Sequence, residues 1–265
     1  HPETALLKAF EKSLLFLKNN FTDKIKKGFT LAEVLITLGV IGIVAAMTLP
    51  ALINKYDRTV TETRLAKFYS TFNQAILRSL EVNGPYEGWS FFVELEPDDE
   101  GNIDQTPINN AFDQYLRPFM NIVNVKEDDC LSKQTDKGKC NYYILADGSA
   151  FTFSEHLNRT IWFYPKADWQ KCVKSYEAPN GICRFVFSFQ PLFKTKDWTY
   201  HSNKGLEPFL YKWDGTEEML LNHTSYGCAL SEGEGMPHLS GAYCTALIQR
   251  NGWKIPKNYP RRIKY

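Results

Sequence analysis

The amino-acid sequence predicts an α+β protein in which one long N-terminal helix packs on an antiparallel β-sheet. Three observations lead to this prediction. They are an apolar run near the N-terminus, an amphipathic pattern that continues it, and short β-rich segments separated by turns further on. The composition agrees with a folded chain, because 43% of the 265 residues are hydrophobic and a disordered chain lacks so much apolar surface.

The apolar run extends from residue 29 to residue 53 and contains one charged residue, Glu33. As a helix, residues 34–53 would be about 30 Å long, which is the thickness of the hydrocarbon core of a membrane. Lys24, Lys26 and Lys27 precede the run. Basic residues on this side predict that the N-terminus stays in the cytoplasm and that the C-terminal head is exported, giving a single-pass membrane protein.

Three simple interpretations compete for this run. It is a secretory signal cleaved after the small residues 44–46, a plain membrane anchor, or a buried core helix. A helix that is apolar all round disfavours the core interpretation in a single soluble domain. Glu33 disfavours the first two, because a carboxylate that enters a bilayer costs about 2.5–3.5 kcal/mol.

A fourth interpretation accounts for Glu33. The stretch KKGFTLAEVLITLGVIGIVAAMTLPALI, residues 26–53, resembles the N-terminus of type IV pilin-like proteins, the family that includes pilins and type II secretion pseudopilins. The resemblance implies that a prepilin peptidase cuts after Gly28 and that the new N-terminal residue, Phe29, is N-methylated. Glu33, Gly42 and Pro50 then stand fifth, fourteenth and twenty-second, where the family carries the same residue types.

The resemblance implies that this segment assembles a filament. A Glu33 carboxylate that pairs with the terminal amine of a neighbouring subunit neutralises both charges in a low-dielectric environment and fixes the register of the subunits. The alternative is a Glu33 side chain that only reaches to the membrane interface. Pro50 and Gly42 weaken the helix, and the family implies a bend or local melting there. Membrane helices also tolerate both residues without such a role.

Residues 1–28 are predicted to be a leader that is removed, so they take no part in the predicted fold. They carry six basic and three acidic residues, which leaves 25 basic and 27 acidic residues from Phe29 onward. This balance gives no support for a protein that bulk electrostatics holds on nucleic acid.

Beyond the apolar run, residues 54–84 are predicted to continue the helix with one face on a core. Charged residues separate apolar residues that recur at steps of mostly three to five, namely Tyr56, Val60, Leu65, Phe68, Phe72, Ile76 and Leu80. The sequence Asn83-Gly84-Pro85 predicts the end of the helix. A globular head, residues 85–265, follows.

The head contains a clear hairpin signal, because the β-rich residues 141–146 and 149–153 flank Asp147-Gly148. Further strands are expected at residues 161–164, 184–189 and 208–213, and a short helix at residues 111–119. All six cysteines lie in the head, which the prediction places outside the cytoplasm, where disulfides persist. They form three local couples without a C-x-x-C motif, which favours Cys130–Cys140, Cys172–Cys183 and Cys228–Cys244 over a zinc site.

The sequence contains no G-x-S-x-G, H-E-x-x-H or P-loop motif, so we predict a structural protein without a cofactor rather than an enzyme. The acidic residues 98–104 do not have EF-hand spacing and predict a solvated turn, as do residues 127–129. Arg261, Arg262 and Lys264 predict a solvated basic end, and the alternative is a contact with DNA or lipid headgroups. Residues 231–241, inside the last cysteine couple, are a candidate contact surface or simply a solvated loop.

The sequence therefore predicts a minor structural subunit of a type IV pilus or a type II secretion pseudopilus. The expected partners are prepilin peptidase, other pilin-like subunits and an inner-membrane assembly platform. After assembly, the subunit is expected in a cell-surface or periplasmic filament. The alternative is a secreted or membrane-anchored extracellular binding module that does not polymerise.

Overall fold

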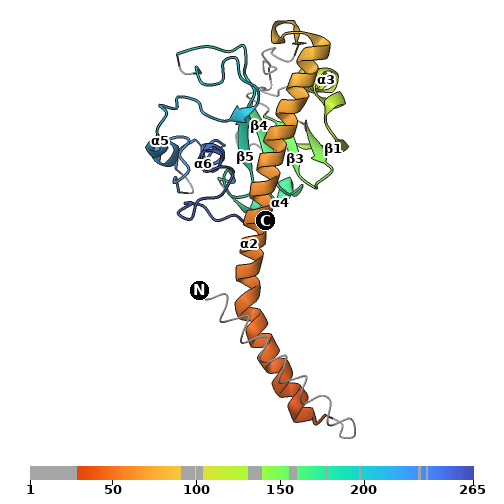
Figure 1. Cartoon of the computed structure of the whole chain (residues 1–265), viewed down its shortest axis with the longest axis vertical. Helices are drawn as coiled ribbons and strands as arrows, with labels where there is room; N and C mark the ends of the chain where they lie inside the picture. The colour runs from red at the N-terminus through yellow and green to blue at the C-terminus, as the bar shows by residue number, and fades with distance from the viewer. Residues whose placement is uncertain are drawn as a thin grey trace. The chain divides into compact units, whose positions relative to one another are not determined.

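The computed structural model describes residues 29–90, 99, 104–130, 139–154, 160–176, 178–196, 198–231, 234–236 and 238–265. Its longest element is the helix α2 (Leu31–Asn83), which is continuous. The contacts divide the chain into two units after Ile53, so the first part of α2 belongs to one unit and the rest belongs to the head (Figure 1).

In the first unit, the side chains of α2 have almost no protein around them. Every residue from 29 to 53 is exposed except Ala45, which is half-buried. The mean hydropathy reaches 2.3, which makes the helix long and apolar enough to cross a membrane. Thr37 and Thr48 donate hydrogen bonds of 2.9 Å to the carbonyl oxygens of Val34 and Val44, so their hydroxyls are satisfied within the helix.

The head contains one antiparallel sheet whose six strands follow the sequence order. They are β1 (Ile122–Asp129), β2 (Lys139–Leu145), β3 (Ala150–Phe153), β4 (Thr160–Tyr164), β5 (Phe185–Ser188) and β6 (Glu207–Pro208). The predicted hairpin is formed by β2 and β3, and its turn places Gly148 at φ +77°, which glycine adopts at little cost. The predicted α+β class is confirmed.

The other elements are short helices: η1 (Tyr86–Gly88), α3 (Thr106–Tyr115), η3 (Arg117–Phe119), α4 (Trp169–Ser175), α5 (Glu217–Asn222) and α6 (Cys244–Arg250). The predicted helix at residues 111–119 starts too late, because Pro107 fits the first turn of α3 and the Asp104 carboxylate accepts the Thr106 N–H at 2.8 Å. The predicted strand at residues 208–213 is also wrong beyond Pro208. Lys212 has φ +60°, which an extended strand cannot include.

The buried face of α2 packs on one face of the sheet. Its centre is the Phe68 ring, whose centroid lies within 5.6 Å of the centroids of Phe72, Phe151, Phe163 and Phe187. Large aromatic side chains contribute much of the apolar area that a core buries. The predicted core residues from Leu65 to Ile76 are therefore buried, at 1% exposure or less.

Nearer its start in the head, α2 buries a face that the apolar pattern does not predict. Tyr56 is 62% exposed, whereas Asp57 and Thr61 are buried. Both polar side chains have partners, because Asp57 pairs with Lys166 at 2.7 Å and the Thr61 hydroxyl lies 2.5 Å from the Tyr265 hydroxyl. Buried polar groups are tolerated when they are hydrogen-bonded in this way.

The opposite face of the sheet is covered by α4, by α5 with its flanking loops and by Ala246 of α6, whose Cys244, Leu247 and Ile248 belong to the core on the α2 side. All residues of β3, β4 and β5 are consequently buried. Two disulfides, Cys130–Cys140 and Cys172–Cys183, lie in this layer, whereas the third, Cys228–Cys244, lies in the core on the α2 side. Each links two segments that are close in the sequence, so the head has the expected disulfide-closed loops.

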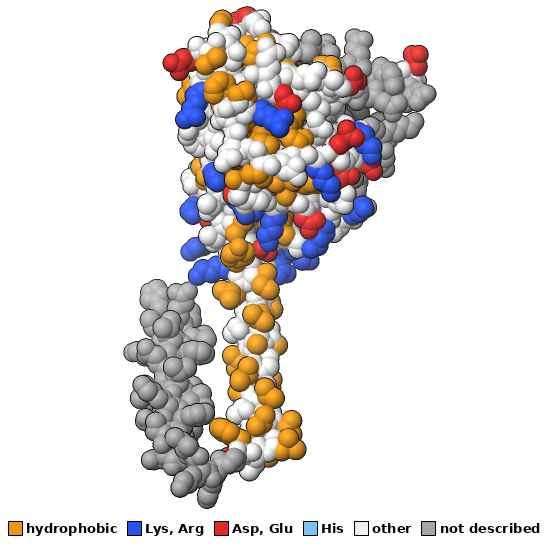
Figure 2. Space-filling model, turned by 90° about the vertical axis from the view of Figure 1, so that its right-hand side faces the viewer, with side chains coloured by type: hydrophobic (Ala, Val, Ile, Leu, Met, Phe, Trp, Pro, Cys, Tyr) orange, Lys and Arg blue, Asp and Glu red, His pale blue; other side chains and the backbone are white. Residues whose placement is uncertain are grey.

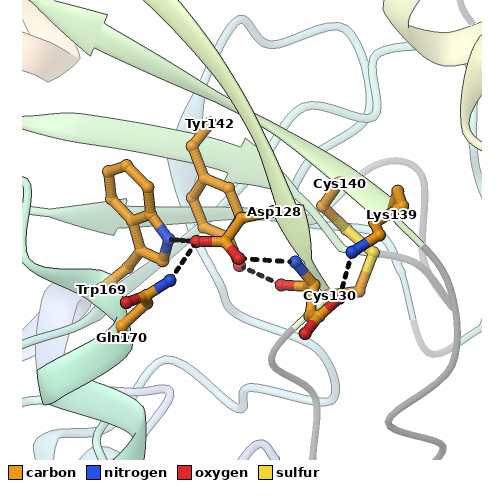
Figure 3. Close-up of polar contacts among 8 residues, drawn as sticks. Asp128, Cys130, Lys139, Cys140, Tyr142, Trp169 and Gln170 are labelled. Carbon is orange, nitrogen blue, oxygen red and sulfur yellow. Dashed lines mark hydrogen bonds and ion pairs between the residues drawn. A yellow bond between two sulfur atoms is a disulfide. The ribbon is translucent and has the colours of Figure 1, made fainter.

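The acidic run at residues 127–129 lies in β1, so the prediction of a solvated turn is wrong. The Asp128 carboxylate accepts hydrogen bonds from Trp169 Nε1 at 3.0 Å and Gln170 Nε2 at 2.6 Å (Figure 3). Burial by itself raises the pKa of Asp128, but these hydrogen bonds and one from the Asp129 N–H outweigh it and hold the pKa below its ordinary value. The acidic run therefore ties β1 to α4. Of the acidic residues 98–104, only Asp99 and Asp104 lie within the described residues.

The prediction of a solvated basic end is wrong for Arg261, which is only 9% exposed. Its guanidinium group donates to four carbonyl oxygens, at 2.7–3.1 Å, and these belong to Ala178, Asn180, Cys228 and Leu230. Arg262 and Lys264 are exposed. One arginine of the pair therefore fastens three chain segments together, and the other faces solvent.

Candidate functional sites

The start of α2 forms a capping box between Thr30 and Glu33. Glu33 Oε2 accepts hydrogen bonds from the Thr30 N–H and the Thr30 hydroxyl, both at 2.9 Å, and the Thr30 hydroxyl accepts the Glu33 N–H at 3.3 Å. Such a box satisfies backbone N–H groups that have no partner inside the helix. A negative charge is also favoured at a helix N-terminus.

The capping box gives Glu33 a local structural role that was not predicted from the sequence. The spacing T-x-x-E before an apolar run is a known helix-start signal, and it could have identified Thr30 beforehand. The box holds the Glu33 carboxylate next to the backbone of Thr30, one residue after Phe29. Prepilin processing would create the new terminal amine at this place.

The other predicted residues of this segment have no packing role in the described chain. A Cβ atom added to Gly39 or Gly42 would meet nothing within 4 Å, so neither glycine is needed for a contact within the subunit. Pro50 lies inside α2 without ending it. Gly28, Lys24, Lys26 and Lys27 lie outside the described residues.

The apolar side chains from Phe29 to Ile53 are the largest exposed hydrophobic surface of the described chain. The exposed fractions of the large apolar side chains range from 40% at Val34 to 78% at Leu31. Soluble monomers rarely expose contiguous apolar patches of this kind, and such surfaces mark contact with a membrane or another protein. This segment is therefore a candidate site for both kinds of contact.

The head has a second candidate site, a recess of about 420 Å³ between the β5–β6 connection and α5. Its lining combines aromatic side chains with cationic ones and consists of Lys196, Thr199, Tyr200, Leu210, Lys212, Trp213, Met219 and His223. The Tyr200 and Trp213 rings meet edge to face, with centroids 5.5 Å apart. This volume lies in the usual range for small-molecule sites.

Further cations lie against the aromatic rings of the recess. The Lys204 ammonium group is 3.3 Å from the centre of the Tyr200 ring, and the Arg250 guanidinium is 5.4 Å from that of Trp213. Burial and the neighbouring Glu207 carboxylate raise the pKa of Tyr200 to about 12, so this phenol stays protonated. Burial and the Lys212 charge lower the pKa of His223, which favours a neutral imidazole at pH 7.

His223 and Ser225 do not form a nucleophilic pair. His223 Nδ1 accepts the backbone N–H groups of Ser225 and Tyr226, at 3.1 and 3.3 Å, so it is already used in a turn. Among the residues that the structure describes, no three or more His, Cys, Asp or Glu side chains are grouped to hold a metal ion. The recess is suited to binding an anionic group beside a flat ring.

Two family models match the chain, one over its N-terminal segment and one over the rest. The model named Family of unknown function (DUF6613) matches residues 51–263, and the prokaryotic N-terminal methylation motif matches residues 23–49. No curated protein and no solved structure matches the chain. The methylation motif confirms the similarity to type IV pilin-like proteins and indicates a pilin-like precursor.

Proposed function

This chain belongs to the Family of unknown function (DUF6613), and on that premise we propose that it is a minor structural subunit of a type IV pilus or a type II secretion pseudopilus. The observation that carries the proposal is a methylation motif at the start of an apolar helix that is exposed throughout residues 29–53, apart from Ala45. Water disfavours so much apolar surface. The segment therefore enters a membrane before assembly and contacts neighbouring subunits afterwards.

The proposed maturation has two steps. Prepilin peptidase cuts after Gly28, and Phe29 is then N-methylated. The leader, residues 1–28, stays in the cytoplasm with Lys24, Lys26 and Lys27, while the head, residues 85–265, is exported with the amphipathic half of the helix, residues 54–84. The work of the mature subunit is mechanical rather than catalytic.

Glu33 has the central part in the proposed assembly. Its carboxylate caps its own helix through Thr30, at 2.9 Å. In the filament, the same carboxylate pairs with the Phe29 amine of a neighbouring subunit, which neutralises two charges in an apolar environment. Glu33 thus has a local structural use and an intermolecular use, and an experiment must separate them.

Two matched variants do so in the native host. Glu33→Gln keeps an oxygen that can complete the capping box but removes the charge, whereas Thr30→Val removes both hydroxyl contacts of the box, leaves the backbone N–H of residue 30 as a donor and keeps the charge. We expect Glu33→Gln to lower the amount of subunit in sheared surface fibres by about tenfold or more, at an unchanged level in the membrane. Thr30→Val should change the amount of subunit in the fibres by less than about twofold. The reverse pattern would assign Glu33 to helix capping alone and would contradict the proposed pairing.

The mature N-terminus gives an independent test. Mass spectrometry of the native protein should find N-methylated Phe29 as the first residue. An end at Met47 would mean ordinary signal cleavage after Ala46, which removes the assembly segment.

The recess in the head favours a second candidate function, an extracellular binding module that does not polymerise. Its cations and aromatic rings suit an acidic sugar, so glucuronic acid and glucose are a suitable pair of probes. Lys212→Asn removes one charge and suits the left-handed backbone at this position, because Asn adopts it readily. Glucuronate binding that this variant weakens, in a protein that never enters fibres, would favour the second function.

A further inference from the structure

The charge of the chain is unevenly distributed. From Phe29 onward there are 25 basic and 27 acidic residues, yet residues 254–265 contain five basic residues and no acidic one. Lys and Arg side chains gather along one end of the head (Figure 2). A local positive surface on a protein that is net negative from Phe29 onward favours an anionic partner at that surface.

Specific contacts hold the C-terminal segment against the first turns of α2 in the head. Arg262 donates to Asn54 Oδ1 at 3.0 Å. Arg58, one turn further along α2, donates to the carbonyl oxygens of Ile255 and Pro256, both at 3.0 Å. The basic side chains are therefore carried by an ordered segment, beside the residues that directly follow the apolar run.

One basic side chain of α2 and three of the C-terminal segment form a surface that we name the basic patch: Arg58, Lys257, Arg262 and Lys264. Within the part of the chain that the structure describes, none of the four has a carboxylate within 4 Å. The basic patch therefore keeps its positive charge.

Two carboxylates on the adjoining part of α2 each pair with a lysine outside the basic patch, and Asp168, which lines a recess together with Lys264, lies more than 4 Å from its ammonium group. Asp57 pairs with Lys166 at 2.7 Å, and Glu62 pairs with Lys254 at 3.0 Å. Glu62 also accepts the Ile255 N–H at 2.9 Å, which holds the C-terminal segment in place.

The basic patch begins five residues after the apolar run in the sequence. Asn54 directly follows Ile53, and at a rise of 1.5 Å per residue the five helical residues from Ile53 to Arg58 are about 8 Å long. The polar layer on each side of a bilayer is about 5–8 Å thick. Tyr56 lies between these residues and is 62% exposed, and tyrosine is enriched at this depth in membrane proteins.

We propose that the basic patch, together with Tyr56, binds anionic phospholipid headgroups while the precursor is anchored in the membrane. This inference rests on the proposed anchoring of residues 29–53. The ligand is the phosphate of the headgroup, which Lys and Arg side chains bind through charge-assisted hydrogen bonds. The contact would fix the orientation of the head on the bilayer before the subunit leaves the membrane.

The full-length protein in nanodiscs that hold one copy each provides the test. A fluorophore on Asn258→Cys, an exposed neutral position beside Lys257, reports the distance to a spin-labelled lipid headgroup that quenches it. We expect about threefold more quenching in discs with 30% phosphatidylglycerol than in pure phosphatidylcholine, at low salt. The difference should vanish in 1 M salt, where the Debye length is about 3 Å.

Matched variants assign the effect to the basic patch. Lys257→Gln, Arg262→Gln and Lys264→Gln combined should abolish the difference, whereas Arg78→Gln, Lys126→Gln and Lys194→Gln combined, at exposed positions outside the basic patch and the recess, should leave it unchanged. Equal quenching of the fluorophore in both lipids, with the basic patch unmodified, would overturn the inference. Loss of fibres in the triple variant of Lys257, Arg262 and Lys264 would then assign the basic patch to contacts between subunits. Failure of the protein to enter the discs at all would instead refute the proposed anchor.

Discussion

The two halves of α2 have similar apolar side chains but use them in opposite ways. Leu38, in the first half, is 61% exposed, whereas Phe68, in the second, is 1% exposed and lies among four other aromatic rings. The first half carries its apolar surface all round, and the second keeps it on one face. An apolar side chain therefore stabilises the folded head only where the head covers it, and elsewhere it is available to lipid or to another subunit.

The largest expected effect on stability comes from comparing one variant in each half of α2. Phe68→Ala should lower the free energy of unfolding of the head by about 3–5 kcal/mol, because it leaves a cavity at the centre of the core. Leu38→Ala should change it by less than about 0.5 kcal/mol. Urea unfolding of the detergent-solubilised protein, followed by tryptophan fluorescence, measures both. A similar loss in the two variants would break the distinction between the halves.

A smaller effect should distinguish the adjacent arginines at the C-terminus. Arg261→Gln leaves several buried carbonyl oxygens without a donor and should cost about 2–4 kcal/mol of unfolding free energy. Arg262→Gln loses one exposed hydrogen bond, to Asn54, and should cost less than about 0.5 kcal/mol. The same urea titrations apply. Equal losses of unfolding free energy in the two variants would mean that the burial of Arg261 does not determine its contribution to stability.

The stability of the head should also depend on the protonation of His201. Burial, together with the charge of Lys204, lowers the pKa of His201 to about 4, although the hydrogen bond to the Pro208 carbonyl oxygen partly opposes this. Because the folded-state pKa is depressed, this stability is present above about pH 6.5 and is lost as the pH falls towards 4.

Between pH 7 and 4.5, we expect the unmodified protein to lose about 2–3 kcal/mol more than His201→Gln, whose amide can donate to Pro208 but does not titrate. Urea midpoints at the two pH values measure the difference, and the variant corrects for carboxylates that titrate in the same range. If the stability of the two proteins changed with pH in parallel, His201 would not be the group responsible for the loss of stability.

The smallest effect should come from Gly42→Ala. An added Cβ meets nothing within 4 Å, so the unfolding free energy of the head should change by less than about 0.5 kcal/mol. Reduced incorporation into fibres, measured as for Glu33, would then indicate that a neighbouring subunit occupies this space. A destabilised head would show instead that the two halves of α2 are energetically coupled.

The local sequence determined the fold class, the continuous helix, the β2–β3 hairpin and the pilin-like N-terminus. These features depend on a helical period, on the turn residues Asp147-Gly148 and on a motif of fixed spacing, all of which can be recognised without knowledge of distant partners. The capping box belongs to the same class, because the T-x-x-E spacing contains it.

Only the tertiary structure decided which polar residues are buried. Arg261 and Arg262 are identical neighbours in the sequence, and they differ because segments 31–83 residues away bring carbonyl oxygens to one of them. Asp57 and Thr61 are buried on α2 because Lys166 and Tyr265 reach them from distant parts of the chain. Asp128 of β1, which is half-buried, is held by Trp169 and Gln170 in the same way. Burial of a polar group is stable only with a partner, and a distant partner is set by the fold rather than by the local sequence.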